Sequence, residues 1–136
     1  MKNGLKTSSR KLKFTRIESW VSAGVPDLLI CDEKGLFHFV ELKFITANAV
    51  NIRPSQISWL TRHQNSSSWI LVKRVQKLQS LDQNPLPELF LYQAKQVLEL
   101  VEQGVKLSPY YYQKSKSFKF DEIYRLISPI YYDNLP

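Results

Sequence analysis

Short apolar runs, separated by polar or glycine- and proline-containing stretches, set the pattern of this chain. Two of the runs lie close together, at residues 28–31 (LLIC) and 37–43 (FHFVELK). A polar connection that ends in Gly35 joins them, so this part of the chain predicts a β-hairpin. Both alternating faces of the second run are largely apolar, so we expect a central strand that is covered on both sides.

Later apolar runs predict two further strands, with a helix between the hairpin and the first of them. Residues 69–75 (WILVKRV) read as a buried strand, and residues 88–92 read as a shorter one. The helix is expected over residues 54–65, because Pro54 suits the first turn of a helix and apolar residues follow it at helical spacing.

A short helix is also predicted before the hairpin, over residues 11–21. Ser8 or Ser9 would be its N-cap. Its apolar residues share one face and would pack on the sheet: Phe14, Ile17 and Val21.

The C-terminal part predicts two more helices. One covers residues 94–103 and is stopped by Gly104. Its inward face is expected to carry Ala94, Val97, Leu98 and Val101. The other covers residues 118–127.

These elements give an α/β fold, in the order α-β-β-α-β followed by β-α-α. A chain of 136 residues, 43% of them hydrophobic, is expected to form one domain over residues 1–136. Residues 11–78 would be its core unit, and residues 79–136 a C-terminal extension with helical and aromatic character.

Three charged residues stand inside or beside the apolar strands of the hairpin. Glu41 and Lys43 point to one face of their strand, whereas Leu42 points to the other. Asp27 opens the neighbouring strand, opposite the end that carries Glu41. Ionised groups in apolar surroundings are unfavourable unless they are paired or bound to a metal ion, so this cluster requires an explanation. His38 points away from Glu41 and reads as a packed or hydrogen-bonded histidine.

The net charge of +7 and the pI of about 9.5 suit a polyanionic partner such as nucleic acid. No apolar run is long enough for a membrane span, and the basic N-terminus lacks the apolar segment of a secretory signal. The single cysteine, Cys31, forms no disulfide framework. We therefore expect a cytoplasmic protein that binds no membrane.

Basic residues near the predicted site are candidates for DNA contacts. They are Lys11, Lys13, Arg16, Arg53, Lys73 and Arg74. Residues 108–116 mix tyrosines with lysines, which suits stacking on unpaired bases. The reading that we favour for these tyrosines is that they cover the core or a dimer partner.

The residues Pro26-Asp27 and Glu41-Leu42-Lys43, followed by Pro54-Ser55-Gln56, resemble the signature of the PD-(D/E)XK nuclease superfamily. Within this superfamily, the sequence GVPDLL is most similar to the virus-type replication-repair nucleases (VRR-NUC) and to Holliday-junction resolvases. Small phage-encoded nucleases are of this kind. The resemblance covers roughly residues 16–75.

The resemblance implies a restriction-endonuclease-like mixed sheet flanked by helices, and a Mg²⁺- or Mn²⁺-dependent DNA endonuclease, with branched DNA as a candidate substrate. Asp27, Glu41 and the carbonyl of Leu42 would hold the metal ion, and Lys43 would assist the chemistry. By the same resemblance, Glu18 is a further ligand and Gln56 points into the active site. A homodimer with paired sites is plausible.

Other readings remain open at this point. Glu18 can be a solvated surface residue, and Gln56 can bond solvent at the helix start. The chain can be a nucleic-acid-binding module with a vestigial, inactive site. It can also be a structural protein in which Asp27, Glu41 and Lys43 form only a buried ion pair.

Overall fold

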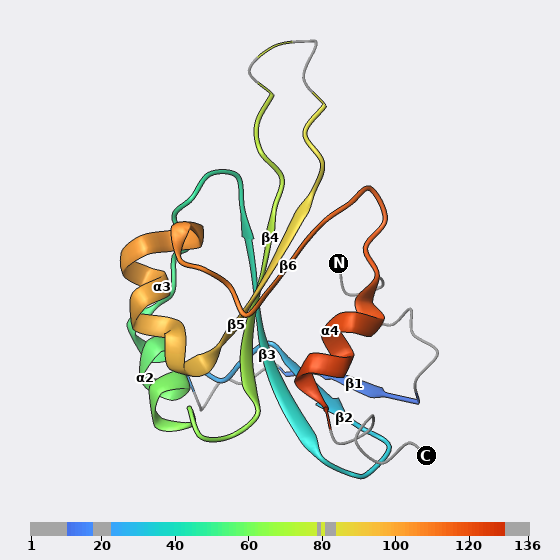
Figure 1. Ribbon diagram of the computed structural model, residues 1–136. Helices are drawn as coiled ribbons and strands as arrows, with labels where there is room; N and C mark the ends of the chain where they lie inside the picture. Colours follow the sequence, from blue (N-terminus) through green and yellow to red (C-terminus); the bar gives the residue numbers. More distant parts are fainter. Residues whose placement is uncertain (1–10, 18–22, 79, 81–83, 130–136) are drawn as a thin grey trace.

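The computed structural model describes residues 11–17, 23–78, 80 and 84–129 (Figure 1). Within these residues, six strands form one mixed sheet with helices on both of its faces, which confirms the α/β class. In chain order the elements are β1 (Lys13–Arg16), β2 (Leu28–Cys31), β3 (Phe37–Ile45), α2 (Pro54–Arg62), β4 (Ser68–Arg74), β5 (Glu88–Gln93), the 3₁₀ turn η1 (Ala94–Gln96), α3 (Val97–Gln103), the 3₁₀ turn η2 (Gly104–Lys106), β6 (Tyr111–Lys114) and α4 (Phe120–Ile127).

The order of the strands in the sheet follows their order in the chain. β3 and β4 run parallel and are joined by α2, whereas all other neighbouring pairs are antiparallel. The predicted hairpin is confirmed, because β2 and β3 pair with Leu28 opposite Val40 and Cys31 opposite Phe37. The parallel step through α2 brings the first turn of that helix next to the end of the hairpin.

Two apolar clusters cover the two faces of the sheet. On the face under α4, buried residues from three strands include Val40, Leu71 and Leu91. On the opposite face, which α2 and α3 cover, the strands contribute Ile70 and Val72. Figure 1 shows α2 and α3 to the left of the sheet and α4 to its right. The expectation that β3 is a central strand covered on both sides is therefore confirmed. We call these the α4 face and the α2 face.

The helix predicted over residues 11–21 is wrong where the structure describes it, because β1 pairs antiparallel with β2. Leu12 and Phe14 both pack against the cluster on the α4 face. Their spacing of two residues fits the alternation of a strand, and pairing with β2 stabilises the extended segment, whereas a short isolated helix is only marginally stable in water. The proposed N-cap serines and Val21 lie outside the described residues.

The inward face predicted for the helix after β5 is partly wrong. Ala94, Val97 and Leu100 are buried, but Leu98 is 62% exposed and Val101 is 41% exposed. The helix opens with the 3₁₀ turn η1, which has about three residues per turn rather than 3.6. We attribute the rotated apolar stripe of α3 to this tighter start.

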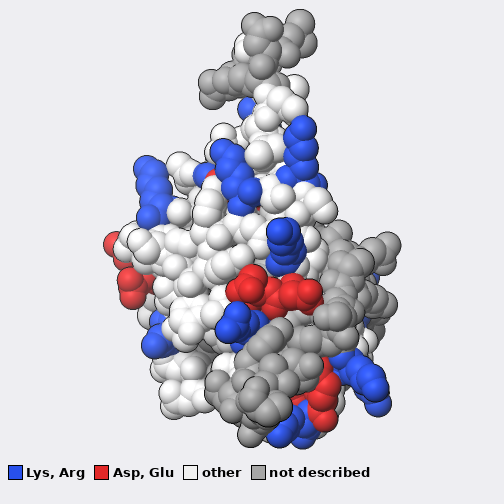
Figure 2. Space-filling view, turned by 45° about the vertical axis from the view of Figure 1, so that its right-hand side comes forward, with Lys and Arg blue, Asp and Glu red and all other residues white. Residues whose placement is uncertain are grey.

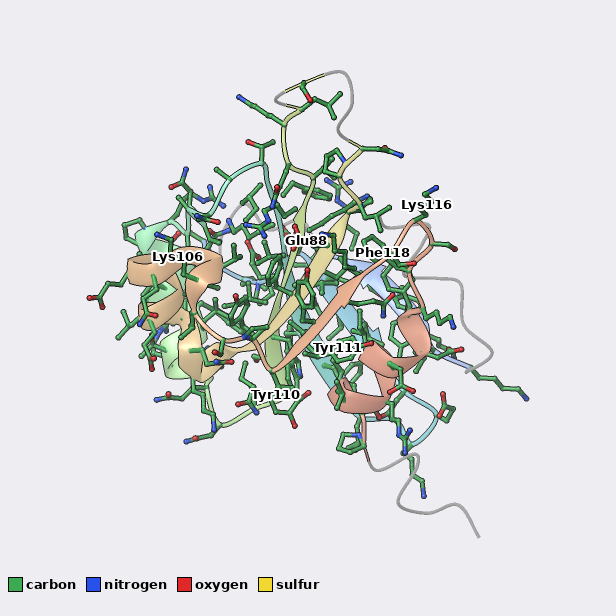
Figure 3. All side chains as sticks on the ribbon, turned by 45° about the horizontal axis from the view of Figure 1, so that its top comes forward. Glu88, Lys106, Tyr110, Tyr111, Lys116 and Phe118 are labelled. Atoms are coloured by element: carbon green, nitrogen blue, oxygen red, sulfur yellow. The ribbon has the colours of Figure 1, made fainter. Side chains whose placement is uncertain are left out.

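The C-terminal half adds a strand that the sequence did not predict, β6. Its tyrosines contact the core: Tyr111 packs against the cluster on the α4 face, and the Tyr112 ring lies 5.0 Å from that of Phe90. Tyr110, which precedes the strand, lies 5.3 Å from the Trp69 ring (Figure 3). These contacts support the reading in which the tyrosines cover the core.

β5 and β6 belong to the same sheet as the strands of the predicted core unit. α4 contributes to the same apolar cluster as those strands. The helix predicted over residues 118–127 is present as α4, which begins two residues later. Within the described part of the chain, no helix has both the length and the apolar character needed to cross a bilayer.

Gly104 ends α3 as predicted, and its backbone allows a close contact. It has φ +64° and ψ −154°, a region open almost only to glycine, and an added Cβ would lie 2.1 Å from the Asn48 carbonyl oxygen. We expect Gly104→Ala to lower the free energy of unfolding by roughly 3 kcal/mol, from backbone strain plus the clash. Gly35→Ala is the matched control, because Gly35 has φ +80° but nothing within 4 Å of an added Cβ. Equal losses in denaturant unfolding would contradict the clash with Asn48.

Candidate active site

The end of the hairpin brings Asp27 and Glu41 together. The register sets Leu28 opposite Val40, so one further step along the ladder sets Asp27 opposite Glu41. Oδ2 of Asp27 accepts the backbone N–H of Leu42 at 3.0 Å. The two carboxylates therefore lie on neighbouring chain segments and on the α2 face, as the sequence predicts.

Glu41 is buried, with only 1% of its surface exposed. Its Oε2 accepts a hydrogen bond from Nε2 of Gln56 at 2.7 Å and lies 3.3 Å from Nζ of Lys43. Its Oε1 is buried and has no hydrogen-bond partner among the described residues. A buried carboxylate oxygen without a donor is unfavourable, so this atom marks a place where a ligand is expected.

Gln56 links the carboxylate to the ammonium group. Its Oε1 accepts hydrogen bonds from Nζ of Lys43 and from the backbone N–H of Arg53, both at 3.0 Å. With 4% of its surface exposed, Gln56 does not bond solvent as one reading proposed. Its place follows from Pro54, which occupies the first turn of α2 and starts the helix beside β3.

Gly24 explains why this helix start can lie so close to the hairpin. It has φ +88°, and an added Cβ would lie 2.1 Å from the carbonyl oxygen of Ser55. Because Gly24 has no side chain, the backbone of the segment before Asp27 packs directly against the first turn of α2. This contact fixes the position of Gln56 relative to Asp27.

The electrostatics of the cluster act mainly on Glu41. Burial, followed by the negative charge of nearby Asp27, raises the pKa of Glu41 to about 7, and the Lys43 ammonium opposes this shift only in part. Near neutral pH, Glu41 is therefore partly protonated. A raised pKa caused by burial and a second carboxylate is typical of functional sites, although structural clusters show it too.

The residues present fit a hard divalent cation. Asp27 and Glu41 offer carboxylate oxygens, which Mg²⁺ and Mn²⁺ prefer, and the unpartnered Glu41 Oε1 is one of them. Among the described residues, no group of three or more His, Cys, Asp and Glu side chains gathers as a metal cluster. Mg²⁺ commonly takes only one or two protein carboxylates and completes its shell with water and phosphate, so two suffice. Glu18, the further ligand implied by the resemblance, lies outside the described residues.

Four of the predicted DNA-contacting residues are exposed: Lys11, Lys13, Arg16 and Arg53. Arg53 directly precedes α2 and donates its backbone N–H to Gln56, so it lies next to the cluster. On the face shown in Figure 2, blue Lys and Arg side chains lie above and below a smaller red group of acidic side chains.

The other two predicted contacts, Lys73 and Arg74, are placed differently. Lys73 is the register partner of Phe44, so it points to the α4 face, away from Lys43. Arg74 forms a two-pronged ion pair with Glu88, at 2.9 and 3.0 Å, and donates to Asn48 Oδ1 at 2.7 Å. These contacts give Arg74 a structural role, and its contact with DNA stays a prediction.

His38 is hydrogen-bonded in the interior, which confirms the structural reading of this residue. Its Nε2 lies 2.8 Å from Oδ2 of Asp32, and its Nδ1 lies 2.6 Å from Oγ of Ser67. Oγ of Ser128, at the end of α4, donates to the same Asp32 oxygen at 2.6 Å. The sequence analysis missed Asp32, which reads as an ordinary turn residue until these distant partners meet.

Fold and site together define a mixed α/β domain with a carboxylate, lysine and glutamine cluster beside its central parallel strand pair. No protein-family model matches the chain, and a search of curated proteins finds no match either. The function is therefore inferred from the geometry of the site.

Proposed function

We propose that this protein is a Mg²⁺- or Mn²⁺-dependent DNA endonuclease of the PD-(D/E)XK kind. The observation that carries the proposal is the meeting of Asp27, Glu41, Lys43 and Gln56, with one Glu41 oxygen buried and unpartnered among the described residues. The mixed sheet flanked by helices, the net charge of +7 and the exposed Arg16 and Arg53 at the site's end of the hairpin support it.

Asp27 and Oε1 of Glu41 would hold the cation, and the resemblance adds the Leu42 carbonyl. Leu42 donates its N–H to Asp27 rather than to β4, so its carbonyl is directed to the same flank of β3. When bound, Mg²⁺ or Mn²⁺ neutralises phosphate charge and makes a water molecule more acidic.

Lys43 would act on the phosphodiester group, and Gln56 would position the groups of the site. The Lys43 side chain is 18% exposed, and its ammonium group is held by Oε1 of Gln56 at 3.0 Å. A fixed ammonium stabilises negative charge that develops on a phosphoryl oxygen, without reorganising during the reaction. Gln56 positions Lys43 and Glu41 at once, so its loss would disturb both.

Cleavage assays with Asp27→Asn test the proposal. Linear, nicked, forked and four-way DNA would be incubated with Mg²⁺ or Mn²⁺. We expect wild-type protein to cut at least one substrate and the variant to be slower by at least about 10²-fold, because a lost metal ligand removes several kcal/mol of transition-state stabilisation. Glu33→Gln, at an exposed acid in the hairpin connection, is the control and should cut like wild type.

Equal rates for wild type and Asp27→Asn would overturn the proposal. Salt-sensitive DNA binding without cleavage in either ion would instead assign the chain to the inactive binding modules. If divalent ions also left the melting temperature unchanged, the cluster would be an ion pair only.

A further inference from the structure

One flank of β3 lacks a described strand just beyond the candidate active site. β2 pairs only with Phe37–Val40, whereas β4 pairs with β3 as far as Ile45. On the open flank, the N–H of Leu42 bonds the Asp27 side chain instead of a neighbouring strand.

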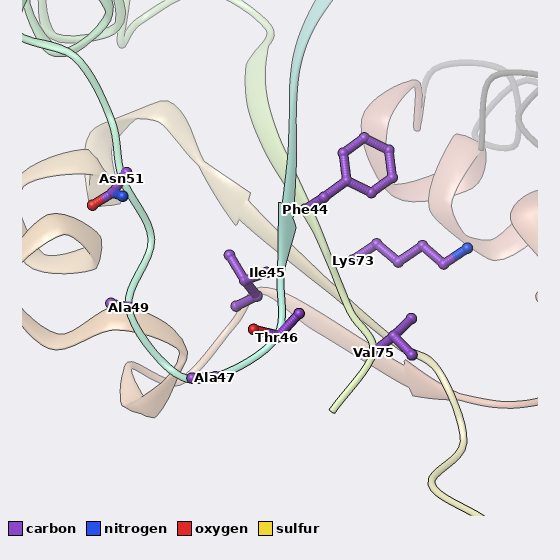
Figure 4. Close-up of a pocket in the computed structure, with 8 residues that line it drawn as sticks. All are labelled: Phe44, Ile45, Thr46, Ala47, Ala49, Asn51, Lys73 and Val75. Carbon is purple, nitrogen blue, oxygen red and sulfur yellow. The ribbon is translucent and has the colours of Figure 1, made fainter. Parts of the chain in front are cut away.

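A groove of about 470 Å³ lies at the end of β3, where β3 meets the following loop and β4 (Figure 4). It is lined by Phe44, Ile45, Thr46, Ala47, Ala49, Asn51, Lys73 and Val75. Ile45 shares the α2 face with Lys43 and lies two residues, or about 7 Å, further along the strand. Phe44 and Lys73 contribute from the α4 face. The groove therefore lies at the end of β3, beyond Lys43 along the strand, and has lining residues on both faces of the sheet.

Phe44 and Lys73 form the α4-face side of the groove. They are register partners in β3 and β4, and Figure 4 shows both side chains extending to the same side of the sheet. Phe44 is 64% exposed, and Val75 beside it is 44% exposed. Nζ of Lys73 lies 5.9 Å from the ring centroid of Phe118, on the β6–α4 connection that also carries Lys116 (Figure 3). Cations among exposed aromatic rings fit a nucleic-acid strand, because bases stack on the rings while phosphates meet the cations.

We propose that this groove holds an unpaired nucleotide adjacent to the scissile phosphate, with its base stacked on Phe44 and its backbone near Lys73. The proposal rests on the proposed function and narrows its substrate to DNA that is single-stranded beside the cleaved bond. Inside a duplex, neighbouring base pairs cover both faces of each base, so an internal base must be unpaired before it can stack on a phenyl ring. The groove volume lies in the range of sites that take small organic groups.

Binding without cleavage tests the proposal. The affinity of wild type and Phe44→Ala for a short oligothymidylate and for a blunt duplex would be measured by fluorescence anisotropy in EDTA. We expect Phe44→Ala to weaken single-strand binding roughly 5- to 100-fold, the range of one base–aromatic stack. Duplex affinity should change less than about twofold, because a base inside a duplex offers Phe44 no free face.

Three further variants separate stacking from general effects. Phe37→Ala removes a phenyl ring that is 57% exposed at the other end of β3 and should leave single-strand binding unchanged. Phe44→Trp keeps an aromatic face and should retain affinity. Lys73→Met keeps the apolar stem and should reduce the salt dependence of single-strand binding by about one phosphate contact.

Equal single-strand affinity of Phe44→Ala and Phe37→Ala would overturn the proposal, as would equal losses for single strand and duplex. A separate measurement, the cleavage assay, shows whether the nuclease proposal fails. Asp27→Asn would then cut DNA like wild type, whatever Phe44→Ala does in EDTA. Conversely, Phe44→Ala could bind single strands as well as wild type does while Asp27→Asn fails to cut DNA. That result would reject the nucleotide-binding role of the groove and leave the nuclease proposal intact.

Discussion

Glu41→Gln is expected to abolish divalent-dependent cleavage and, above pH 7, to make the protein more stable. The loss of activity should be at least about 10²-fold, since the substitution removes an anionic ligand of the proposed metal ion and the associated transition-state stabilisation. The gain in stability has a separate cause. An ionised Glu41 is unfavourable in its buried position beside Asp27, and glutamine keeps the shape of the side chain without the charge.

The sign of the pH dependence follows from the raised pKa of Glu41. The folded protein holds this proton up to about pH 7, whereas an ordinary glutamate releases it near 4.5. Between these values the native state binds more protons than the unfolded state, so stability falls as the pH rises. The Glu41 contribution is complete below about pH 4.5 and lost above about pH 7. We expect Glu41→Gln to exceed wild type by on the order of 3 kcal/mol at pH 8, and to match it near pH 4.5.

Denaturant unfolding of metal-free protein across this pH range measures the effect. Glu88→Gln is the matched control with the opposite sign. Burial alone would raise the pKa of Glu88, but hydrogen bonds from Arg74 and Tyr112 outweigh it and lower the pKa. Glu88→Gln should therefore lose stability at pH 8. Added Mg²⁺ should stabilise wild type but not Glu41→Gln, because only wild type keeps both carboxylates. A Glu41→Gln variant no more stable than wild type at pH 8 would contradict the buried-charge account.

Asp32→Ala is expected to lower the free energy of unfolding by roughly 3 kcal/mol or more at pH 7. The substitution leaves the buried His38 ring and the Ser128 hydroxyl without the Asp32 carboxylate, and it removes the acceptor for the backbone N–H groups of Lys34 and Leu36. Breaking a buried hydrogen-bonded pair by deleting one partner has an effect of this size. Because Ser128 follows α4, the loss should also loosen the packing of that helix.

The pH dependence of this network runs in the direction opposite to that of Glu41. Burial alone would raise the pKa of Asp32, but hydrogen bonds from His38 and Ser128, then from Leu36 and Lys34, outweigh it and lower the pKa to about 2. The Asp32 carboxylate therefore contributes stability that is complete above about pH 4 and lost as the pH falls through about 2.

Acid unfolding of wild type and Asp32→Ala, followed by circular dichroism, checks both statements. The two proteins should differ most at neutral pH and converge near pH 2. Glu33→Ala, an exposed acid next in the chain, should behave like wild type in this assay. A constant difference between Asp32→Ala and wild type over the whole range would show that lost packing, rather than the charge, sets the effect.

The local pattern of the chain was sufficient for the hairpin and for the two carboxylates. Two short apolar runs joined by a polar connection predicted β2 and β3, and the pleat of a strand then required Glu41 and Lys43 to share a face. Pro54 likewise predicted the start of α2. The same reasoning failed for β1, because a short segment with Leu12 and Phe14 fits either periodicity until β2 offers it backbone partners.

The sequence by itself therefore determined the class of the fold and which charged groups meet at the end of the hairpin, since both follow from neighbours within a strand or across one turn. Only the tertiary structure decided how these groups are held. The hydrogen bond of Gln56 to Glu41, the contact of Gly24 with α2 and the bonds of Asp32 to His38 and Ser128 join residues distant in the chain. Such contacts depend on the parallel pairing of β3 with β4 and on the docking of α4, which local periodicity does not encode.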